Sequence, residues 1–318
     1  MMLHGIHHIT AITADARCNL DVYTRVLGLR LLKKSVNQDD PAAYHLFYGD
    51  EHGHPGADLT FFAYPGIARG AAGTGMVHRI VWRVASRQAL DFWERRLARE
   101  GLAATRDDET LRFADPEGLE HELVLDDTPD APLVAVHPEV PAAVALRGFA
   151  GVRAYAADPE GSQRFLERLG FTRRPGGGFE ARGALRGAFY VYDWLSRPGR
   201  SGAGTVHHVA WCALDEEHAA WRRRVREAGG DPTPVIDRYY FRSIYFREPS
   251  GVLFEIATRG PGFTVDEPPD RLGARLSLPP RLEPLRPTLE RLLAPLPDPR
   301  AAWPGRPTPV GPEPSERP

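Results

Sequence analysis

The chain of 318 residues has very few cysteines and no large excess of charge of either sign. Its two cysteines, Cys18 and Cys212, cannot build a disulfide framework, and this scarcity favours a reducing compartment, so we expect a cytoplasmic protein. The 40 basic and 42 acidic residues leave a net charge of −2. This balance argues against a nucleic-acid partner and against binding to an anionic membrane.

Long hydrophobic runs and lysines are also scarce. No apolar run approaches the ~20 residues of a membrane span, and the start MMLHGIHHIT lacks the features of a secretory signal, so neither is expected. Lysine occurs only at Lys33 and Lys34, and the remaining 38 basic residues are arginines. We attribute this to coding bias, and it disfavours chemistry that proceeds through a lysine Schiff base.

The chain does contain a pair of adjacent histidines that occurs twice in a strand-like setting. His7 and His8 lie in HGIHHITAIT, and His207 and His208 lie in GTVHHVAWCA, 200 residues further on. Successive side chains of a strand point to opposite faces, so only one histidine of each pair is expected to face a given cavity. The repetition indicates that the two segments are equivalent parts of an internal repeat.

Four segments share the order of a strand, a helix and further strands. The first strands are expected where apolar residues alternate or run together, at 7–13, 78–84, 151–157 and 207–213. Amphipathic runs of helical period follow at 20–29, 89–101, 161–171 and 216–230. Each segment then closes on a strand, at 57–64, 118–125, 186–193 and 251–258. We therefore predict four βαβββ modules.

The predicted fold is α+β, with the four βαβββ modules arranged as two pairs that each form a half-open barrel. A single module would leave an apolar sheet face exposed, and pairing covers it. We expect residues 1–142 to hold the N-terminal pair and 143–265 the C-terminal pair, joined by a proline-rich stretch. Residues 266–318 form a proline-rich extension, in which 285–296 is expected to be a short helix and the last ~15 residues to be disordered.

Aligning the modules by the glycine that leads each closing strand shows where polar residues recur. Four residues after that glycine, modules one to four hold Thr60, Glu122, Val191 and Glu255; the matching first-strand position holds His8, Arg79, Gly151 and His208. Glu255 lies in an otherwise apolar strand, where a carboxylate is costly unless it is paired or binds a cation. Two imidazoles and one carboxylate are the ligand set of non-haem Fe(II) sites that activate O2. We therefore predict that His8, His208 and Glu255 bind a metal, and that Arg79 and Glu122 form an ion pair.

These motifs resemble the vicinal oxygen chelate superfamily. More narrowly, GIHHITAIT, DDPAAYHLFYGDEHGHPGADLTFF, GTVHHVAW and DRYYFRSIYFREPSGVLFEIAT are similar, in this order, to the ring-cleaving dioxygenases that open hydroquinones, such as 2,6-dichlorohydroquinone dioxygenase. The resemblance covers residues 3–290 and implies the vicinal oxygen chelate fold, with one Fe(II) between modules one and four. Mn(II) is compatible with the same ligands. The implied partners are a small aromatic dihydroxy substrate and O2, and a homo-oligomer is left open.

The same resemblance implies five further pocket residues, namely His7, Thr10, His207, Arg238 and Tyr245. Arg238 would supply a fixed cation that stabilises a developing oxyanion, unless it is a surface arginine paired with Asp237 or Glu248. Tyr245 would position a substrate hydroxyl or exchange a proton with it. Strand alternation turns His7 and His207 away from the cavity unless a β-bulge re-aims them, and their alternative role is structural hydrogen bonding.

The expected function is that of a non-haem Fe(II)-dependent dioxygenase that opens a hydroquinone-type ring, halogenated or alkylated, with O2. A glyoxalase-type lyase or isomerase on the same fold normally uses a second carboxylate ligand, and that position here is Thr60. A thiol transferase uses three similar ligands, usually in chains of two modules. A metal-free protein that sequesters an aromatic ligand is a further alternative, and metal content distinguishes it from the others.

Overall fold

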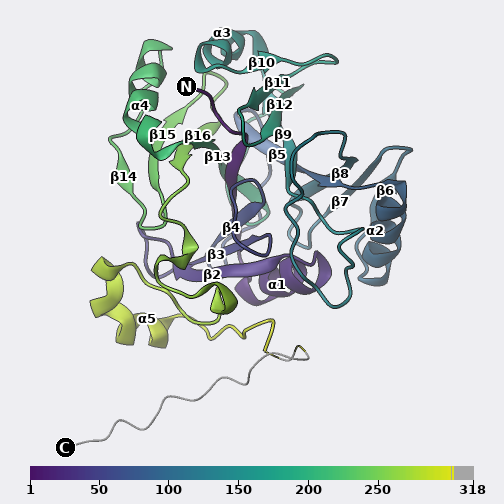
Figure 1. Cartoon of the computed structure of the whole chain (residues 1–318), viewed down its shortest axis with the longest axis vertical. Coiled ribbons are helices and arrows are strands. Elements are labelled where there is room, and N and C mark those ends of the chain that lie inside the picture. Colours follow the sequence, from purple (N-terminus) through teal and green to yellow (C-terminus); the bar gives the residue numbers. More distant parts are fainter. Residues whose placement is uncertain (302, 304–318) are drawn as a thin grey trace, which may run out of the picture.

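The computed structural model describes residues 1–301 and 303, and it contains the four expected modules (Figure 1). Module one comprises β1 (Ile6–Thr13), α1 (Ala16–Asp21), the π-helix η1 (Val22–Val26), β2 (Arg30–Val36), β3 (Tyr44–Gly49) and β4 (Asp58–Ala63). Module two comprises β5 (Met76–Val84), α2 (Arg87–Arg99), β6 (Ala104–Arg106), β7 (Thr110–Ala114) and β8 (Glu120–Leu125).

Modules three and four repeat this order. Module three comprises β9 (Phe149–Ala156), α3 (Pro159–Leu169), β10 (Thr172–Arg173), β11 (Phe179–Arg182) and β12 (Gly187–Trp194). Module four comprises β13 (Thr205–Ala213), the 3-10 helix η2 (Asp215–Glu217), α4 (His218–Glu227), β14 (Ile236–Asp237), β15 (Arg242–Arg247) and β16 (Leu253–Thr258). Figure 1 shows the helices α1 to α4 around the outside of the strands, as expected for sheets whose outer faces need cover.

Local sequence signals place the helix ends. At the start of α3, the side chain of Asp158 accepts hydrogen bonds from the backbone N–H groups of Glu160 and Gly161, which have no partner within the helix. The helix ends at Gly170, whose φ of 93° lies in the left-handed region that favours glycine. Between these ends, Phe165 and Leu169 are buried, so the apolar face of the helix packs on the core.

Two eight-stranded sheets hold all the modules, and this confirms the α+β fold of paired half-open barrels. One sheet has the order β14-β15-β16-β13-β1-β4-β3-β2 and the other β10-β11-β12-β9-β5-β8-β7-β6. The first sheet therefore joins modules one and four, and the second joins modules two and three. This corrects the expected grouping of sequential modules within 1–142 and 143–265. The cause is that β1 pairs with β13, and β5 with β9, which covers the otherwise open edge of each first strand.

The strand register supports the alignment of the modules that the sequence predicts. Glu255 lies beside Ala210 in β13, two residues after His208, and Thr60 lies beside Thr10 in β1, two residues after His8. The same offset recurs in the second sheet, in the pairs Val81 with Glu122 and Arg153 with Val191. The four aligned positions are thus structurally equivalent.

The C-terminal extension lies along β2, at the edge of the first sheet. It contains η3 (Phe263–Val265), η4 (Pro269–Arg271), η5 (Pro280–Leu285) and α5 (Arg286–Leu292). The predicted short helix is confirmed, with Leu289 and Leu293 buried. The two lysines of the chain both bind this extension. Lys33 donates to Asp266 and Glu267 at 2.6 and 2.5 Å, and Lys34 donates to the carbonyl of residue 296 at 2.9 Å.

The sequence also predicts a disordered C-terminal end and no membrane span. The last ~15 residues, which the sequence predicts to be disordered, lie outside the described residues. Within residues 1–301 and 303, the structure has no helix whose length and hydropathy would let it cross a membrane.

Candidate metal centre

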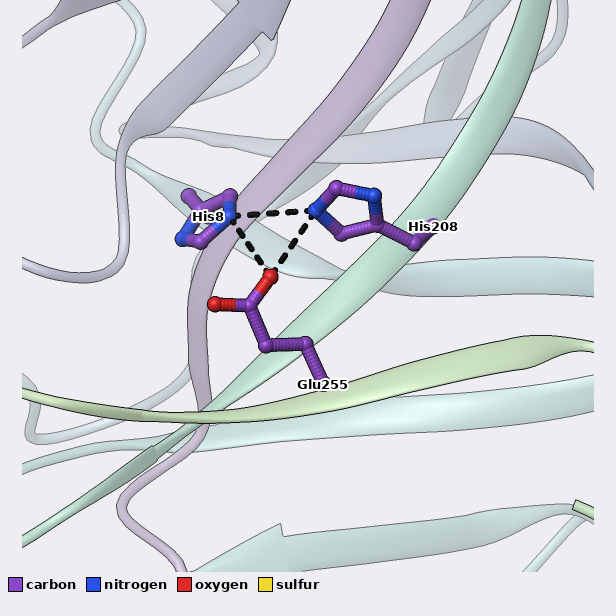
Figure 2. A group of neighbouring side chains, drawn as sticks. All are labelled: His8, His208 and Glu255. Atoms are coloured by element: carbon purple, nitrogen blue, oxygen red, sulfur yellow. Dashed lines mark hydrogen bonds and ion pairs between the residues drawn. The ribbon is translucent and has the colours of Figure 1, made fainter. Parts of the chain in front are cut away.

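Three neighbouring strands of the first sheet bring the predicted ligands together. His8 lies on β1, His208 on β13 and Glu255 on β16, and these strands are adjacent in the sheet. The Nε2 atoms of the two histidines are 3.3 Å apart, and Glu255 Oε2 lies 3.3 Å from His8 Nε2 and 3.0 Å from His208 Nε2. Figure 2 shows the three side chains pointing toward one common centre. Among the described residues, this is the one group of three or more His, Cys, Asp or Glu side chains close enough to hold a metal ion.

A β-bulge precedes each of the two predicted histidine ligands. Where β1 pairs with β13, Ile6 lies opposite Trp211 and His8 opposite Ala210, so His7 is an extra residue in β1. Further along the same pair of strands, Thr10 lies opposite His208 and Ala11 opposite Val206, so His207 is an extra residue in β13. A bulge interrupts strict alternation and re-aims side chains. Both histidines of each pair can therefore lie near the site.

The two bulges create matching pairs of imidazole rings. His7 Nδ1 lies 2.9 Å from His8 Nδ1, and His207 Nδ1 lies 2.8 Å from His208 Nδ1. The ring planes are nearly perpendicular in both pairs, at 84° and 80°. The pairs differ in exposure, because His7 is buried and His207 is exposed. His7 and His207 thus contact the rear nitrogen of each ligand, on the side away from the common centre.

The charge at the centre is buried. Glu255 is 0% exposed, and its Oε1 accepts a hydrogen bond of 2.5 Å from Ser243. Burial opposes ionisation, but the neighbouring imidazoles outweigh it and hold the pKa of Glu255 well below its usual value. Burial likewise opposes the charged form of His8, yet the Glu255 carboxylate raises the pKa of His8. The centre therefore stabilises an anion and favours a cation beside it.

The donor set fits a divalent metal ion. Glu255 Oε2 is buried and has no hydrogen bond to any described residue, which is costly for a carboxylate oxygen unless a cation binds it. Ligands that bind one ion at about 2.1 Å lie about 3.0 to 3.4 Å from one another, for angles from octahedral to tetrahedral. The observed spacings of 3.0 to 3.3 Å fall in this range.

A cavity of about 440 Å³ opens on the centre. His8 and His208 form part of its wall, and much of the rest is aromatic, including Phe47, Phe62 and Phe241. Flat apolar walls next to a polar centre suit a small aromatic molecule.

Arg238 and Tyr245, both predicted, line this cavity together. Tyr245 lies opposite Glu255 in the register of β15 with β16, which places it on the same face of the sheet. Its hydroxyl accepts a hydrogen bond of 3.2 Å from Arg238 Nε. Arg238 also donates two hydrogen bonds of 2.9 Å to the carboxylate of Asp39, so the alternative pairing with Asp237 or Glu248 is wrong. Burial raises the pKa of Tyr245, with the Glu255 charge adding to the effect, so the phenol keeps its proton at neutral pH.

Thr10, the remaining predicted pocket residue, is fully buried and does not line the cavity. Its Oγ1 lies 2.8 Å from Thr60 Oγ1, and Thr60 Oγ1 lies 2.9 Å from His45 Nε2. His45 does line the cavity, and burial lowers its pKa well below the usual value for histidine. Sequence reasoning gave His45 no role. The available signal was its place in the segment DDPAAYHLFYGD, which carries part of the family resemblance.

The second sheet carries no equivalent centre. Arg79 occupies the position of the histidine ligand, and its guanidinium lies 3.4 Å from Glu122, so the predicted ion pair is confirmed. Gly151 and Val191 hold the matching positions of module three and offer no ligand atoms. Among the described residues, the candidate ligand cluster therefore lies only in the sheet of modules one and four.

Comparison with known proteins identifies the family of this chain and several full-length relatives. The model of the Glyoxalase/Bleomycin resistance protein/Dioxygenase superfamily matches residues 5–123 and 89–256. The chain belongs to this superfamily. It is 40% identical to MhqA of Bacillus subtilis, provisionally named a ring-cleaving dioxygenase, over 93% of this chain and 100% of that protein. It is also 32% identical to the chlorohydroquinone/hydroquinone 1,2-dioxygenase of Sphingobium indicum, over 92% of this chain and 96% of that protein. These relatives match this chain over nearly their full length, and they confirm the expected class of enzyme, a ring-cleaving dioxygenase.

Solved structures support the fold at two levels of similarity. A crystal structure from Bacillus subtilis, provisionally described as a dioxygenase, superposes with a TM-score of 0.86 at 39% identity, covering 93% of this chain and 98% of that chain. Glyoxalase I from Zea mays superposes with a TM-score of 0.57 at 16% identity, covering 80% and 92% of the two chains. The second match shows a shared superfamily fold and says nothing of a shared reaction.

Proposed function

We propose that this superfamily member is a non-haem Fe(II)-dependent dioxygenase that opens a hydroquinone-type aromatic ring with O2. The observation that carries the proposal is the buried triad of His8, His208 and Glu255, two members of which, His8 and His208, line an aromatic cavity of about 440 Å³. Support for the ring substrate comes from the Sphingobium relative, whose name specifies chlorohydroquinone and hydroquinone. The proposal includes hydroquinones that carry halogen or alkyl substituents.

His8, His208 and Glu255 would hold the metal. Fe(II), when bound, would lower the pKa of a hydroquinone hydroxyl and would allow electron transfer between the ring and O2. Mn(II) accepts the same ligands, so iron is the proposal and manganese the nearest substitute. Three protein ligands leave coordination positions for oxygen atoms from outside the protein.

His7 and His207 would orient the two histidine ligands, and His207 also lines the cavity. A histidine that gives Nε2 to a metal keeps its proton on Nδ1 and must donate it to a neighbour. The Nδ1 atoms of His7 and His207 are placed to accept those protons at 2.9 and 2.8 Å. This fixes the tautomer of His8 and His208 and the direction of both rings.

Arg238 and Tyr245 would act on the oxygen atoms of the reacting molecules. The two hydrogen bonds to Asp39 hold the guanidinium of Arg238 in one orientation, so its positive charge is fixed at the cavity wall before a substrate arrives. Tyr245 accepts from Arg238, which leaves its own hydroxyl proton free to be donated into the cavity. Together they offer a cation and a proton donor to an oxyanion that forms as the ring opens.

The rival lyase or isomerase is not supported by the site. The position that would hold a second carboxylate is Thr60, and its hydroxyl lies between Thr10 and His45 within hydrogen-bond distance of both. Two imidazoles and a single carboxylate remain as ligands in this part of the chain. We therefore advance no second function.

Oxygen consumption tests the proposal directly. Iron-loaded protein is prepared under argon and mixed with hydroquinone, methylhydroquinone, chlorohydroquinone or catechol in an oxygen electrode. We expect one O2 consumed per ring opened, with Glu255→Gln as the inactive control. Absence of uptake with every dihydroxybenzene, in protein shown to contain one iron per chain, would end the dioxygenase assignment. Absence of any bound metal after anaerobic purification and reconstitution would favour the metal-free binding protein.

Two further expectations concern the location and the assembly of the protein. We place the reaction in the cytoplasm, on the ground that both cysteines, one exposed and one buried, are free thiols. The choice between a monomer and a homo-oligomer is open, and sedimentation equilibrium at several protein concentrations decides it.

A further inference from the structure

Three polar side chains form a hydrogen-bonded series from the buried Thr10 to the wall of the cavity. Thr10 Oγ1 lies 2.8 Å from Thr60 Oγ1, which lies 2.9 Å from His45 Nε2. Thr10 and Thr60 are both 0% exposed. His45 lines the cavity that His8 and His208 also line.

The burial of Thr10 determines which group donates in each hydrogen bond of this series. The Thr10 hydroxyl has one hydrogen-bond partner among the described residues, which is Thr60 Oγ1. A buried hydroxyl must donate its proton, because an unmet donor costs more than the bond is worth. Thr10 therefore donates to Thr60, and Thr60 is left with its own proton to donate to His45 Nε2. The reverse direction would leave the Thr10 proton without an acceptor.

The order of donors and acceptors in this series determines the tautomer of His45. Since Nε2 accepts, the neutral ring carries its proton on Nδ1, and among the described residues Nδ1 has no hydrogen-bond partner. The ring is also held sterically, with its centroid 3.9 Å from that of Phe47 and 4.5 Å from that of Phe62. His45 is thus a fixed, neutral hydrogen-bond donor at the wall of the cavity.

We propose that His45 Nδ1–H donates a hydrogen bond to the second oxygen of a 1,4-dihydroxybenzene whose first oxygen lies at the metal centre, and so selects a para-diol over a ring without the second oxygen. The inference rests on the proposed function for the identity of the ring. It assigns a further substrate-binding residue to the cavity. Thr60 and Thr10 are positioning residues that act through His45.

Anaerobic binding measures this hydrogen bond apart from turnover. Hydroquinone and phenol differ by the one oxygen in question, and their Kd values are measured by calorimetric titration into iron-loaded protein without O2. We expect wild-type protein to bind hydroquinone about 2- to 10-fold more tightly than phenol, the size of one neutral hydrogen bond. His45→Phe should lower this ratio to about 1, while His52→Phe, the same change at an exposed histidine outside the cavity, should leave it unchanged.

A second pair of variants separates the hydrogen bond from a packing effect. Thr60→Val keeps the shape of Thr60 and removes the proton that fixes the His45 tautomer, so the binding ratio should fall. Thr60→Ser restores the hydroxyl and should restore the ratio. The proposal is overturned if the wild-type ratio is near 1, if neither compound binds, or if both His45→Phe and Thr60→Val keep the wild-type ratio. Oxygen uptake by wild-type protein decides the proposed function separately, because the binding experiment contains no O2.

Discussion

His7 and His207 occupy equivalent places but differ in burial, so replacing them should have different effects on metal binding. Each contacts the Nδ1 atom of a proposed metal ligand at nearly the same distance, 2.9 and 2.8 Å, but His7 is 4% exposed whereas His207 is exposed. Replacing either with Phe removes the acceptor and keeps an aromatic ring. At His8 the orphaned N–H would stay buried, whereas at His208 water can replace the lost ring nitrogen.

The expected magnitudes follow from this difference in burial. An unmet buried donor costs about 1 to 3 kcal/mol, which corresponds to about 5- to 150-fold in a binding constant. This agrees with the roughly 10- to 100-fold loss of metal affinity typical when a hydrogen-bond partner of a ligand is removed. We expect His7→Phe to weaken metal binding about 10- to 100-fold. His207→Phe should weaken it by less than about 10-fold.

Competition against a chelator of known affinity measures both values under argon. Urea unfolding of the metal-free variants serves as the control, because a loss of affinity counts only where the apo protein remains folded. Equal losses at the two positions, or no loss at His7, would refute the reasoning from burial. A loss that appears only in the apo stability would assign both residues a purely structural role.

Three further predictions concern other parts of the molecule. Glu255→Gln should reduce bound iron from one per chain to a small fraction, measured by elemental analysis. Lys33→Met should lower the free energy of unfolding by ~3–5 kcal/mol in urea, because it leaves the carboxylates of Asp266 and Glu267 without their buried cation; adding Glu267→Gln should recover part of the loss. Burial raises the pKa of Asp58 from 3.8 to about 7, so the native state holds a proton that the unfolded chain has already released between these values. Stability should therefore fall as pH rises, by ~3 kcal/mol more in metal-free wild type than in Asp58→Asn between pH 5 and pH 8, and equal pH dependence of the two would exclude this pKa.

The candidate ligands could be predicted from the sequence because the modules align by counting residues from the glycine that leads each closing strand. His8 and His208 occupy equivalent places in the first strands of two modules, and Glu255, a lone carboxylate in an apolar closing strand, already indicates a cation. The element order was predictable for the same reason, since each module carries its own strand and helix periodicity.

The arrangement of the modules could not be read in this way. Nothing in the periodicity of β1 indicates whether its free edge will pair with module two or module four, and the structure pairs it with β13 of module four. The β-bulges at His7 and His207 were equally hidden, because they arise where two distant strands meet. The partners of the pocket residues depend on those same long-range contacts. Arg238 binds Asp39, which is 199 residues away, rather than its sequence neighbour Asp237.

The account depends most on one ion being held jointly by modules one and four. Anomalous diffraction at the iron absorption edge, from crystals of the iron-loaded protein, tests this directly. We predict a single strong peak per chain, about 2.1 Å from His8 Nε2, His208 Nε2 and a carboxylate oxygen of Glu255. A peak elsewhere, for example beside His52 and His54, or no peak in protein with one iron per chain by elemental analysis, would contradict the assignment.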